Sequence, residues 1–237
     1  MEKVREEVLY KYSFYQPVDG YRYSIDALLL AGFVKDKKKQ IKILDIGTGS
    51  GIITLLISKR FPDWEFSAVE IQKDLYEIAN ENFQLHNLEV NLLYCDYRDL
   101  EEQDNYDIIV SNPPYFNNGH QPSNQQTAVA RHEIFGDMES LIGKAKKLLK
   151  ASGYFYVIYP ANRLAELLTK LSNDKLAPYA IKPIYPKQEM EATLVMVVAK
   201  KNYKGRVQLL TPLYIGDSNG NDTKEIKDLY EKGVLEW

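Results

Sequence analysis

An amide, two prolines and an aromatic ring stand in a row at residues 112–115, directly after the strand-like run YDIIVSN (106–112). The side-chain carbonyl of Asn112 and the backbone carbonyl of Pro113 can accept both N–H groups of a planar amine and draw its nitrogen toward a nucleophilic geometry. Tyr115 can stack on an unpaired base, which is worth about 1–3 kcal/mol. The segment therefore indicates alkylation of an amino group; the alternative is a rigid turn held by the prolines.

A second segment that could do chemistry is the glycine-rich DIGTGSG (45–51), between a predicted strand and a predicted helix. Gly47, Gly49 and Gly51 allow the backbone to turn tightly and to approach a ligand. Their spacing differs from the G-x-G-x-x-G of dinucleotide-binding proteins, and the acidic residue Asp45 stands two positions before the first glycine. We expect a ligand site here, with a tight turn that binds nothing as the alternative.

Two carboxylates stand where the next two predicted strands end. Glu70 closes the strand at 65–70, where it can accept hydrogen bonds from both hydroxyls of a ribose. Asp96 closes the strand at 90–96, where it can accept from the exocyclic amine of an adenine, or simply cap a turn. Together with the glycine segment, these residues predict an adenosine-shaped site.

Hydrophobic patterns predict the elements that must position these residues. Strands are predicted at 41–47, 65–70, 90–96, 106–112 and 154–160, and helices at 50–61, 73–87 and 138–153. A further helix near 161–172 precedes two closing strands at 178–185 and 192–199. This order predicts an α/β fold, with a mainly parallel sheet covered by helices on both faces and ligands at the carboxyl ends of its strands.

Composition sets the broad class. The 237 residues, 45% of them hydrophobic, suit a single domain with a large core, which we expect to span 1–237. No apolar run approaches the ~18 residues of a membrane span, and the first residues lack a secretory signal, so we expect a cytoplasmic protein. Cys95 is the only cysteine and the three histidines have no metal-ligand spacing, so we expect neither a disulfide nor a bound metal.

The charge distribution bears on whether a polyanion could bind. The net charge of −3 argues against a strongly basic, non-specific nucleic-acid binder. However, residues 1–60 carry a net +4, residues 61–139 a net −13 and residues 140–237 a net +6. Basic flanks that contact phosphates beside an acidic pocket would explain this pattern, and so would ordinary solvated helix faces. The candidate phosphate contacts are Lys37 to Lys39, Lys200, Lys201, Lys204 and Arg206.

The combination of DIGTGSG, Glu70, Asp96 and SNPPY resembles the class I S-adenosylmethionine-dependent methyltransferases that methylate amino groups. This resemblance covers about residues 40–200 and implies a Rossmann-like, seven-stranded sheet whose last strand is antiparallel. Three further segments resemble the bacterial tRNA(Val) adenine-N6 methyltransferases: FYQPVDGYRYSIDALLLAGF (14–33), ARHE (130–133) and KPIYPKQEMEATLVMVVAKK (182–201). The narrower resemblance implies N6-methylation of adenine 37, beside the anticodon, with tRNA as the partner.

The resemblance also implies roles for individual residues. The three glycines would pass the methionine part of S-adenosylmethionine, with Asp45 counted among the cofactor-binding residues, Glu70 at the ribose and Asp96 at the adenine. Asn112 would hold the target amine, with Pro113 and Tyr115 completing the catalytic group. Asp26 would meet the α-amino group of the cofactor; alternatively, Ser24 or Asp26 caps the helix that follows.

Two predictions concern the RNA. The segment at 117–127 is rich in asparagine and glutamine and cannot supply core, so we expect a loop that is mobile without RNA and closes over a splayed nucleotide. Arg131 and His132 are candidate RNA contacts, or else a solvated pair. We expect residues 1–40 to form an N-terminal extension that covers the cofactor site, and residues 201–237 a C-terminal extension. The oligomeric state stays open.

Other functions can share the NPPY segment. Glutamine methylation of a release factor poses the same electronic problem, but those enzymes resemble a longer architecture with a helical domain in front, and only about 40 residues precede the first strand here. Guanine-N2 methylation of ribosomal RNA stays open. DNA adenine methylation would need a recognition domain that we do not find, and a scaffold without catalysis fits poorly with an intact Asn112 and Tyr115.

Overall fold

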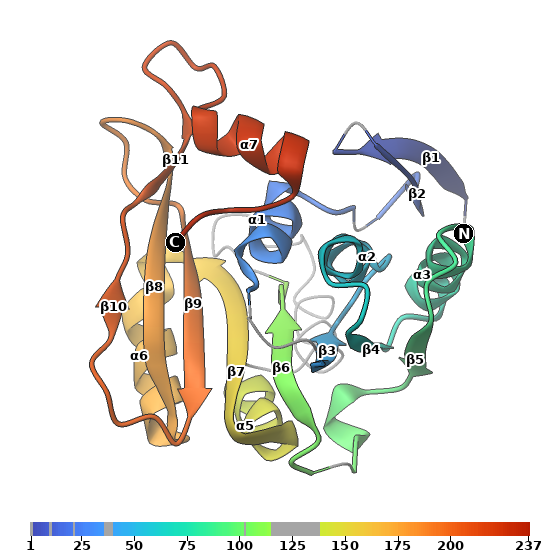
Figure 1. The fold of residues 1–237 in the computed structure, drawn as a ribbon, viewed down its shortest axis with the longest axis horizontal. Helices are drawn as coiled ribbons and strands as arrows, with labels where there is room; N and C mark the ends of the chain where they lie inside the picture. Colours follow the sequence, from blue (N-terminus) through green and yellow to red (C-terminus); the bar gives the residue numbers. More distant parts are fainter. Residues whose placement is uncertain (1, 10, 21, 36–39, 102, 115–137) are drawn as a thin grey trace, which may run out of the picture.

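The computed structural model describes residues 2–9, 11–20, 22–35, 40–101, 103–114 and 138–237. Its centre is a twisted sheet with helices on both sides (Figure 1). Seven strands correspond to the predicted ones: β3 (Lys42–Ile46), β4 (Glu65–Glu70), β5 (Val90–Tyr94), β6 (Tyr106–Ser111), β7 (Leu149–Pro160), β8 (Leu176–Lys187) and β9 (Leu194–Lys201). The predicted α/β class is thereby confirmed.

The strand order across these seven is β5-β4-β3-β6-β7-β9-β8. All neighbouring pairs are parallel except the two that β9 makes with β7 and β8, so the antiparallel last strand implied by the resemblance is present. Two short strands, β10 (Gln208–Leu209) and β11 (Leu213–Gly216), add in parallel to the outer side of β8. The sheet therefore has nine strands among the described residues, two more than the seven expected.

The strands are apolar on both faces because helices cover both faces. Ile108 and Val110 of β6 point into one core cluster, while Ile109, between them, points into the other. The same alternation runs along β7 and β9, and it follows from the two-residue period of a strand. A continuous apolar run such as DIIV is therefore what a central parallel strand requires.

The described residues form six α-helices: α1 (Ile25–Phe33), α2 (Ile52–Arg60), α3 (Lys73–Leu85), α5 (Met138–Leu148), α6 (Leu164–Asn173) and α7 (Lys224–Lys232). Helix α2 is buried along its whole apolar length because α1 packs on its outer side. Helix α5 ends earlier than predicted, since Leu149 already pairs with Tyr106 of β6 and begins β7. The predicted helix at 161–172 begins with a short 3-10 turn, Ala161–Arg163, before α6.

The N-terminal residues form a hairpin that sequence patterns did not predict. Strand β1 (Lys3–Val8) pairs antiparallel with β2 (Tyr12–Pro17), and β2 packs against α3 (Figure 1). The His86 ring and the Ser13 carbonyl lie 2.7 Å apart, and Lys3 pairs with Glu81. The hairpin is therefore attached mainly to the side of α3.

The C-terminal residues close over α1. Leu229 of α7 and Leu235 pack against Gly32, and the indole of Trp237 donates to the Phe33 carbonyl at 2.8 Å. A fully buried lysine, Lys182 of β8, lies beneath α7, where its Nζ donates to the Thr211 carbonyl at 3.1 Å and lies 3.6 Å from a Glu225 carboxylate oxygen. Residues of both chain ends thus share one core cluster with the central sheet.

No helix within the described residues is long and apolar enough to cross a membrane.

Replacing Leu55 in α2 by alanine should lower the free energy of unfolding by about 2–5 kcal/mol, because the side chain is 0% exposed and leaves a cavity. The matched control is Leu209→Ala, since Leu209 is 75% exposed and its loss should cost less than about 0.5 kcal/mol. Urea unfolding followed by circular dichroism measures both. Equal midpoints for the two variants would contradict the assignment of α2 to the core.

Candidate active site

Four neighbouring strands bring the predicted site residues to one edge of the sheet. Asp45 of β3 pairs with Ala68 of β4 on one side and with Val110 of β6 on the other, and β4 pairs in turn with β5. Because these strands are parallel, their carboxyl ends lie together. The order across that edge is the end of β5 with Asp96, the end of β4 with Glu70, the glycine turn after β3, and the end of β6 with Asn112.

The glycine turn uses left-handed backbone angles at all three glycines. The φ angles are 72° at Gly47, 59° at Gly49 and 90° at Gly51, which other residues adopt only with strain. A Cβ on Gly51 would lie 2.7 Å from the ring of Phe83, whereas a Cβ on Gly47 would have no atom within 4 Å among the described residues. Packing therefore requires Gly51, and Gly47 leaves open space where a ligand can approach the backbone.

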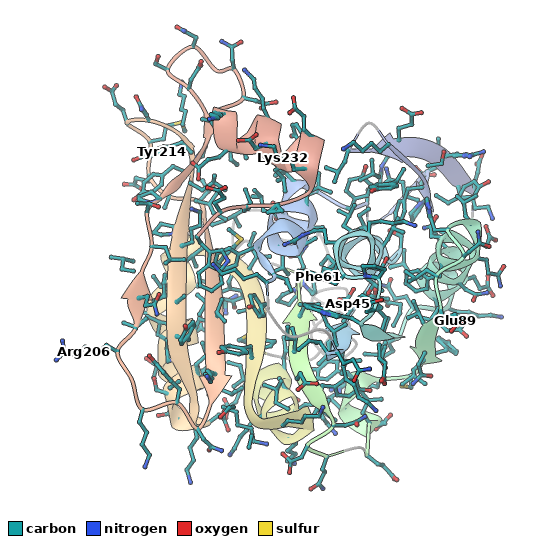
Figure 2. The ribbon with its side chains drawn as sticks, in the orientation of Figure 1. Asp45, Phe61, Glu89, Arg206, Tyr214 and Lys232 are labelled. Atoms are coloured by element: carbon teal, nitrogen blue, oxygen red, sulfur yellow. The ribbon has the colours of Figure 1, made fainter. Side chains whose placement is uncertain are left out.

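Asp45 supports the turn from below. It is 2% exposed, and its Oδ2 accepts from the hydroxyls of Thr48 at 2.7 Å and Thr54 at 2.8 Å (Figure 2 shows its position inside the fold). Burial raises the pKa of Asp45 to about 6, although these hydroxyls favour the charged form. Its Oδ1 accepts no hydrogen bond from any described residue. The carboxylate thus ties β3, the turn and the first turn of α2 together.

Glu70 joins the end of β4 to the same turn. Its Oε2 accepts from the backbone N–H of Gly49 and its Oε1 from that of Gln72, both at 2.8 Å. The side chain is 4% exposed, and burial raises its pKa while the backbone N–H groups oppose that rise. The Ile71 backbone N–H and the Gln72 side chain also act as donors that lower this pKa, so several donors of the turn surround the carboxylate.

Asp96 lies just after β5 and caps the short 3-10 helix Tyr97–Asp99. Its Oδ1 accepts from the backbone N–H of Arg98 at 2.8 Å, and its Oδ2 accepts from the Arg98 guanidinium. Burial alone would raise the pKa of Asp96, but the hydrogen bonds and charge of Arg98 outweigh it and hold the pKa below its usual value. The capping alternative is therefore realised, and a contact with adenine stays a prediction.

Asn112 follows β6 directly. The preceding residue, Ser111, is buried and donates its hydroxyl to the Ile46 carbonyl at 2.8 Å, which fixes the end of β6 against β3. Asn112 and Pro113 are half-buried and Pro114 is exposed. The predicted residues Tyr115, Arg131 and His132, the loop at 117–127 and Lys37 to Lys39 lie outside the described residues.

Asp26 lies in the first turn of α1, whose N-cap position is Ser24. Burial raises the pKa of Asp26, and a hydrogen bond from the Ser24 hydroxyl partly offsets that rise. Helix α1 packs on α2, the helix that starts from the glycine turn. A contact between Asp26 and a cofactor stays a prediction.

Several residues that shape this site were not predicted from the sequence. Thr48, Thr54 and Ser111 hold the strand ends and the turn through their hydroxyls. Asn82 of α3 donates its Nδ2 to the Ser50 carbonyl of the turn at 2.9 Å. A signal existed for Asn82, because it is a polar residue within the apolar stripe formed by Leu75, Ile78, Ala79 and Phe83.

Within the described part of the chain, no group of three or more histidine, cysteine, aspartate and glutamate side chains could hold a metal ion.

Comparison with known proteins identifies the family of this chain. The model of the methyltransferase small domain matches residues 25–173. The tRNA1(Val) (adenine(37)-N6)-methyltransferase of Flavobacterium johnsoniae is 30% identical over 192 residues, which cover 78% of this chain and 81% of the relative. The enzyme of the same name from Flavobacterium psychrophilum is 28% identical over 197 residues, covering 81% of this chain and 84% of the relative.

A solved structure shares the fold over nearly its full length. It is described as a predicted O-methyltransferase from Agrobacterium tumefaciens, with a TM-score of 0.72, 19% identity, and coverage of 90% of this chain and 98% of that chain. At this identity the likeness concerns the fold alone, which is that of the class I methyltransferases. The chain therefore belongs to the methyltransferase small domain family and, within it, to the family of the tRNA1(Val) (adenine(37)-N6)-methyltransferases.

Proposed function

We propose that this protein transfers a methyl group from S-adenosylmethionine to the N6 amino group of an adenine in tRNA, with adenine 37 of tRNA(Val) as the target. The observation that carries the proposal is the order of four adjacent strand ends, which puts the glycine turn between Glu70 and Asn112. Membership of the family supports the same reaction. We place the reaction in the cytoplasm, where bacterial tRNA is found.

The strand ends fit S-adenosylmethionine. Gly47 leaves open space beside the backbone, so the methionine part can pass there. The carboxylate of Glu70 stands at the end of β4, where it can accept from the ribose hydroxyls. Asp96, with its lowered pKa, is ionised and can accept from the adenine amine. Asp26, and Asp45 from beneath the turn, supply negative charge toward the cationic amino group and sulfonium, with the N-terminal extension 1–40 partly covering this end. When bound, the cofactor supplies an electrophilic methyl group.

Asn112 is proposed to orient the target amine. Its side-chain carbonyl accepts one N–H of the adenine amino group and the Pro113 carbonyl accepts the other, which weakens the conjugation of the nitrogen lone pair with the ring. The hydroxyl of Ser111 holds the start of this segment on the Ile46 carbonyl, so the two acceptors are carried by a fixed strand end. Tyr115 is proposed to stack on the base. The surplus proton of the methylated amine passes to water, so no general base is required.

Labelled S-adenosylmethionine tests the reaction directly. The protein is incubated with labelled cofactor and total tRNA, and in parallel reactions with ribosomal RNA and with a release factor. Mass spectrometry of the tRNA nucleosides should find label in 6-methyladenosine, and RNase mapping should place it at position 37 of tRNA(Val). Label only in a release-factor glutamine, or only in 2-methylguanosine of ribosomal RNA, would replace the proposal with the corresponding alternative.

The candidate phosphate contacts differ in the exposure of their side chains and in their hydrogen-bond partners. Lys201 is mostly buried and donates to Asp104 and to the Leu149 carbonyl, both at 2.6 Å, while Lys200 lies over the ring of Tyr154 and donates to its hydroxyl at 3.0 Å. Lys204 and Arg206 are exposed, and Arg206 extends away from the edge of the sheet (Figure 2). We therefore propose Lys204 and Arg206, rather than Lys200 and Lys201, as phosphate contacts of this flank.

Glu70→Ala should weaken binding of S-adenosylmethionine by about 1.5–3 kcal/mol, because a charged hydrogen-bond acceptor is lost from the ribose. Isothermal calorimetry measures the dissociation constant. Glu65→Ala is the matched control, since Glu65 begins the same strand and its carboxylate is exposed in a surface pair with Lys42. An unchanged constant in Glu70→Ala would remove this residue from the site.

Asn112→Ala should reduce turnover by about 100-fold or more while cofactor affinity stays nearly constant, because the lost hydrogen bond acts as the amine reacts. Single-turnover methylation of tRNA measures the rate. Asn91→Ala, at an exposed position of β5, serves as the control. Near-normal turnover in Asn112→Ala would exclude the mechanism given above.

Changing Lys204 and Arg206 together to glutamine should flatten the dependence of tRNA affinity on salt. Fewer phosphate contacts form in this variant, so fewer counterions are released when tRNA binds. Filter binding at several salt concentrations measures the slope, and cofactor affinity should stay constant. Lys224→Gln with Lys232→Gln removes the same charge from α7 and should leave the slope unchanged. Equal slopes in both double variants would place the RNA elsewhere.

A further inference from the structure

The hairpin β1–β2 and the glycine turn are joined by one side chain. Asn82 of α3 is 0% exposed and lies between them. Its Oδ1 accepts from the Tyr15 backbone N–H at 2.7 Å, and its Nδ2 donates to the Tyr15 carbonyl at 2.8 Å and to the Ser50 carbonyl at 2.9 Å. The orientation of the amide follows from its partners, since exchanging O and N would face two carbonyls with an oxygen.

The bond pattern resembles strand pairing. The carboxamide of Asn82 binds the N–H and the C=O of the same residue, Tyr15, as a neighbouring strand would in an antiparallel ladder. This takes up the free edge of β2 at that residue. The second hydrogen of Nδ2 is then left for Ser50, so the same amide completes its hydrogen bonding on the turn.

The turn is held from two sides. On the side of β3, Asp45 accepts hydrogen bonds from Thr48 and Thr54. On the side of α3, Asn82 donates a hydrogen bond to the Ser50 carbonyl. Phe83, the next residue of α3, lies directly under Gly51. A shift of α3 or of the hairpin would therefore displace the backbone of the glycine turn, which forms part of the proposed cofactor site.

We infer that Asn82 is a positioning residue that couples the N-terminal hairpin to the cofactor turn, so that cofactor binding and hairpin ordering favour each other. The inference rests on the proposed cofactor site. The coupling is reciprocal by thermodynamic linkage: if the hairpin holds the turn in its binding form, a bound cofactor must also hold the hairpin. The hairpin thereby influences the cofactor site through Asn82.

Hydrogen exchange on the wild-type protein tests the coupling without any substitution. Addition of S-adenosylhomocysteine should slow amide exchange in peptides from the turn and also in peptides from β2. In Asn82→Ala, the analogue should still protect the turn but no longer β2. Protection of the turn alone in the wild-type protein would overturn the inference.

Calorimetry with S-adenosylhomocysteine gives a second measurement. Asn82→Ala leaves the Tyr15 peptide groups and the Ser50 carbonyl without this partner. The dissociation constant of the variant for S-adenosylhomocysteine should therefore rise at least about tenfold, which corresponds to about 1.4 kcal/mol. With tRNA, KM for the cofactor should rise while kcat at saturating cofactor stays within about twofold. Asn80→Ala is the matched control, since Asn80 is an exposed asparagine of the same helix.

These measurements distinguish a failure of the proposed cofactor site from a failure of the coupling through Asn82. If the wild-type protein does not bind the analogue, the proposed cofactor site fails. If the wild-type protein binds it and Asn82→Ala binds equally well with a native circular dichroism spectrum, the cofactor site stands and the coupling is overturned. If Asn82→Ala does not fold, the exchange of β2 in the wild-type protein decides.

Discussion

The site depends on one buried carboxylate beneath one tight turn. The chain has to leave β3, reverse within a few residues and begin α2, while keeping one side of the turn free for a ligand. Three left-handed glycines make the reversal sterically possible, but they also leave a flexible loop unless something holds it. Asp45 supplies that hold by accepting from Thr48 and Thr54, and the Val69 carbonyl of β4 accepts from Gly47 and Thr48. The positions of Glu70 and Asn112 relative to the turn follow from the strand pairing on either side.

Burying acidic groups at the strand ends and at the start of α1 has an electrostatic consequence. Desolvation raises the pKa of Asp45, Glu70 and Asp26, so their surroundings disfavour negative charge. A cationic ligand reverses this effect, because a nearby positive charge favours the ionised carboxylate. Negative charge at these three residues suits a sulfonium cofactor better than an anionic nucleotide. Only Glu70 of the three lies in the net-negative segment 61–139, so they explain little of the charge of that segment.

Much of the fold could be predicted from the sequence because the central strands are buried on both faces and the helices between them are amphipathic. The hairpin β1–β2 could not, since KVREEV alternates only weakly and its partner on α3 is distant in sequence. The places of Glu70 and Asn112 at strand ends could be predicted, because strand ends are visible in the sequence. Asn82 and the partners of Lys201 could not, because a side-chain hydrogen bond across the fold leaves no local pattern. Asp96 caps the 3-10 turn and also stands at the edge of the sheet where the cofactor site is proposed, so its local role does not decide between the two functions.

The packing of the chain's last residues on α1 bears on how the protein is made. Trp237 bonds to the Phe33 carbonyl across 204 positions, and Leu229 and Leu235 cover Gly32. At 5–20 residues per second, a ribosome needs about 10–40 s to synthesise the chain between these two segments. During that time the apolar surface of α1 is without these partners, and contacts between such distant segments form slowly. The apolar surface of α1 is therefore an aggregation hazard during synthesis, which a chaperone could shield.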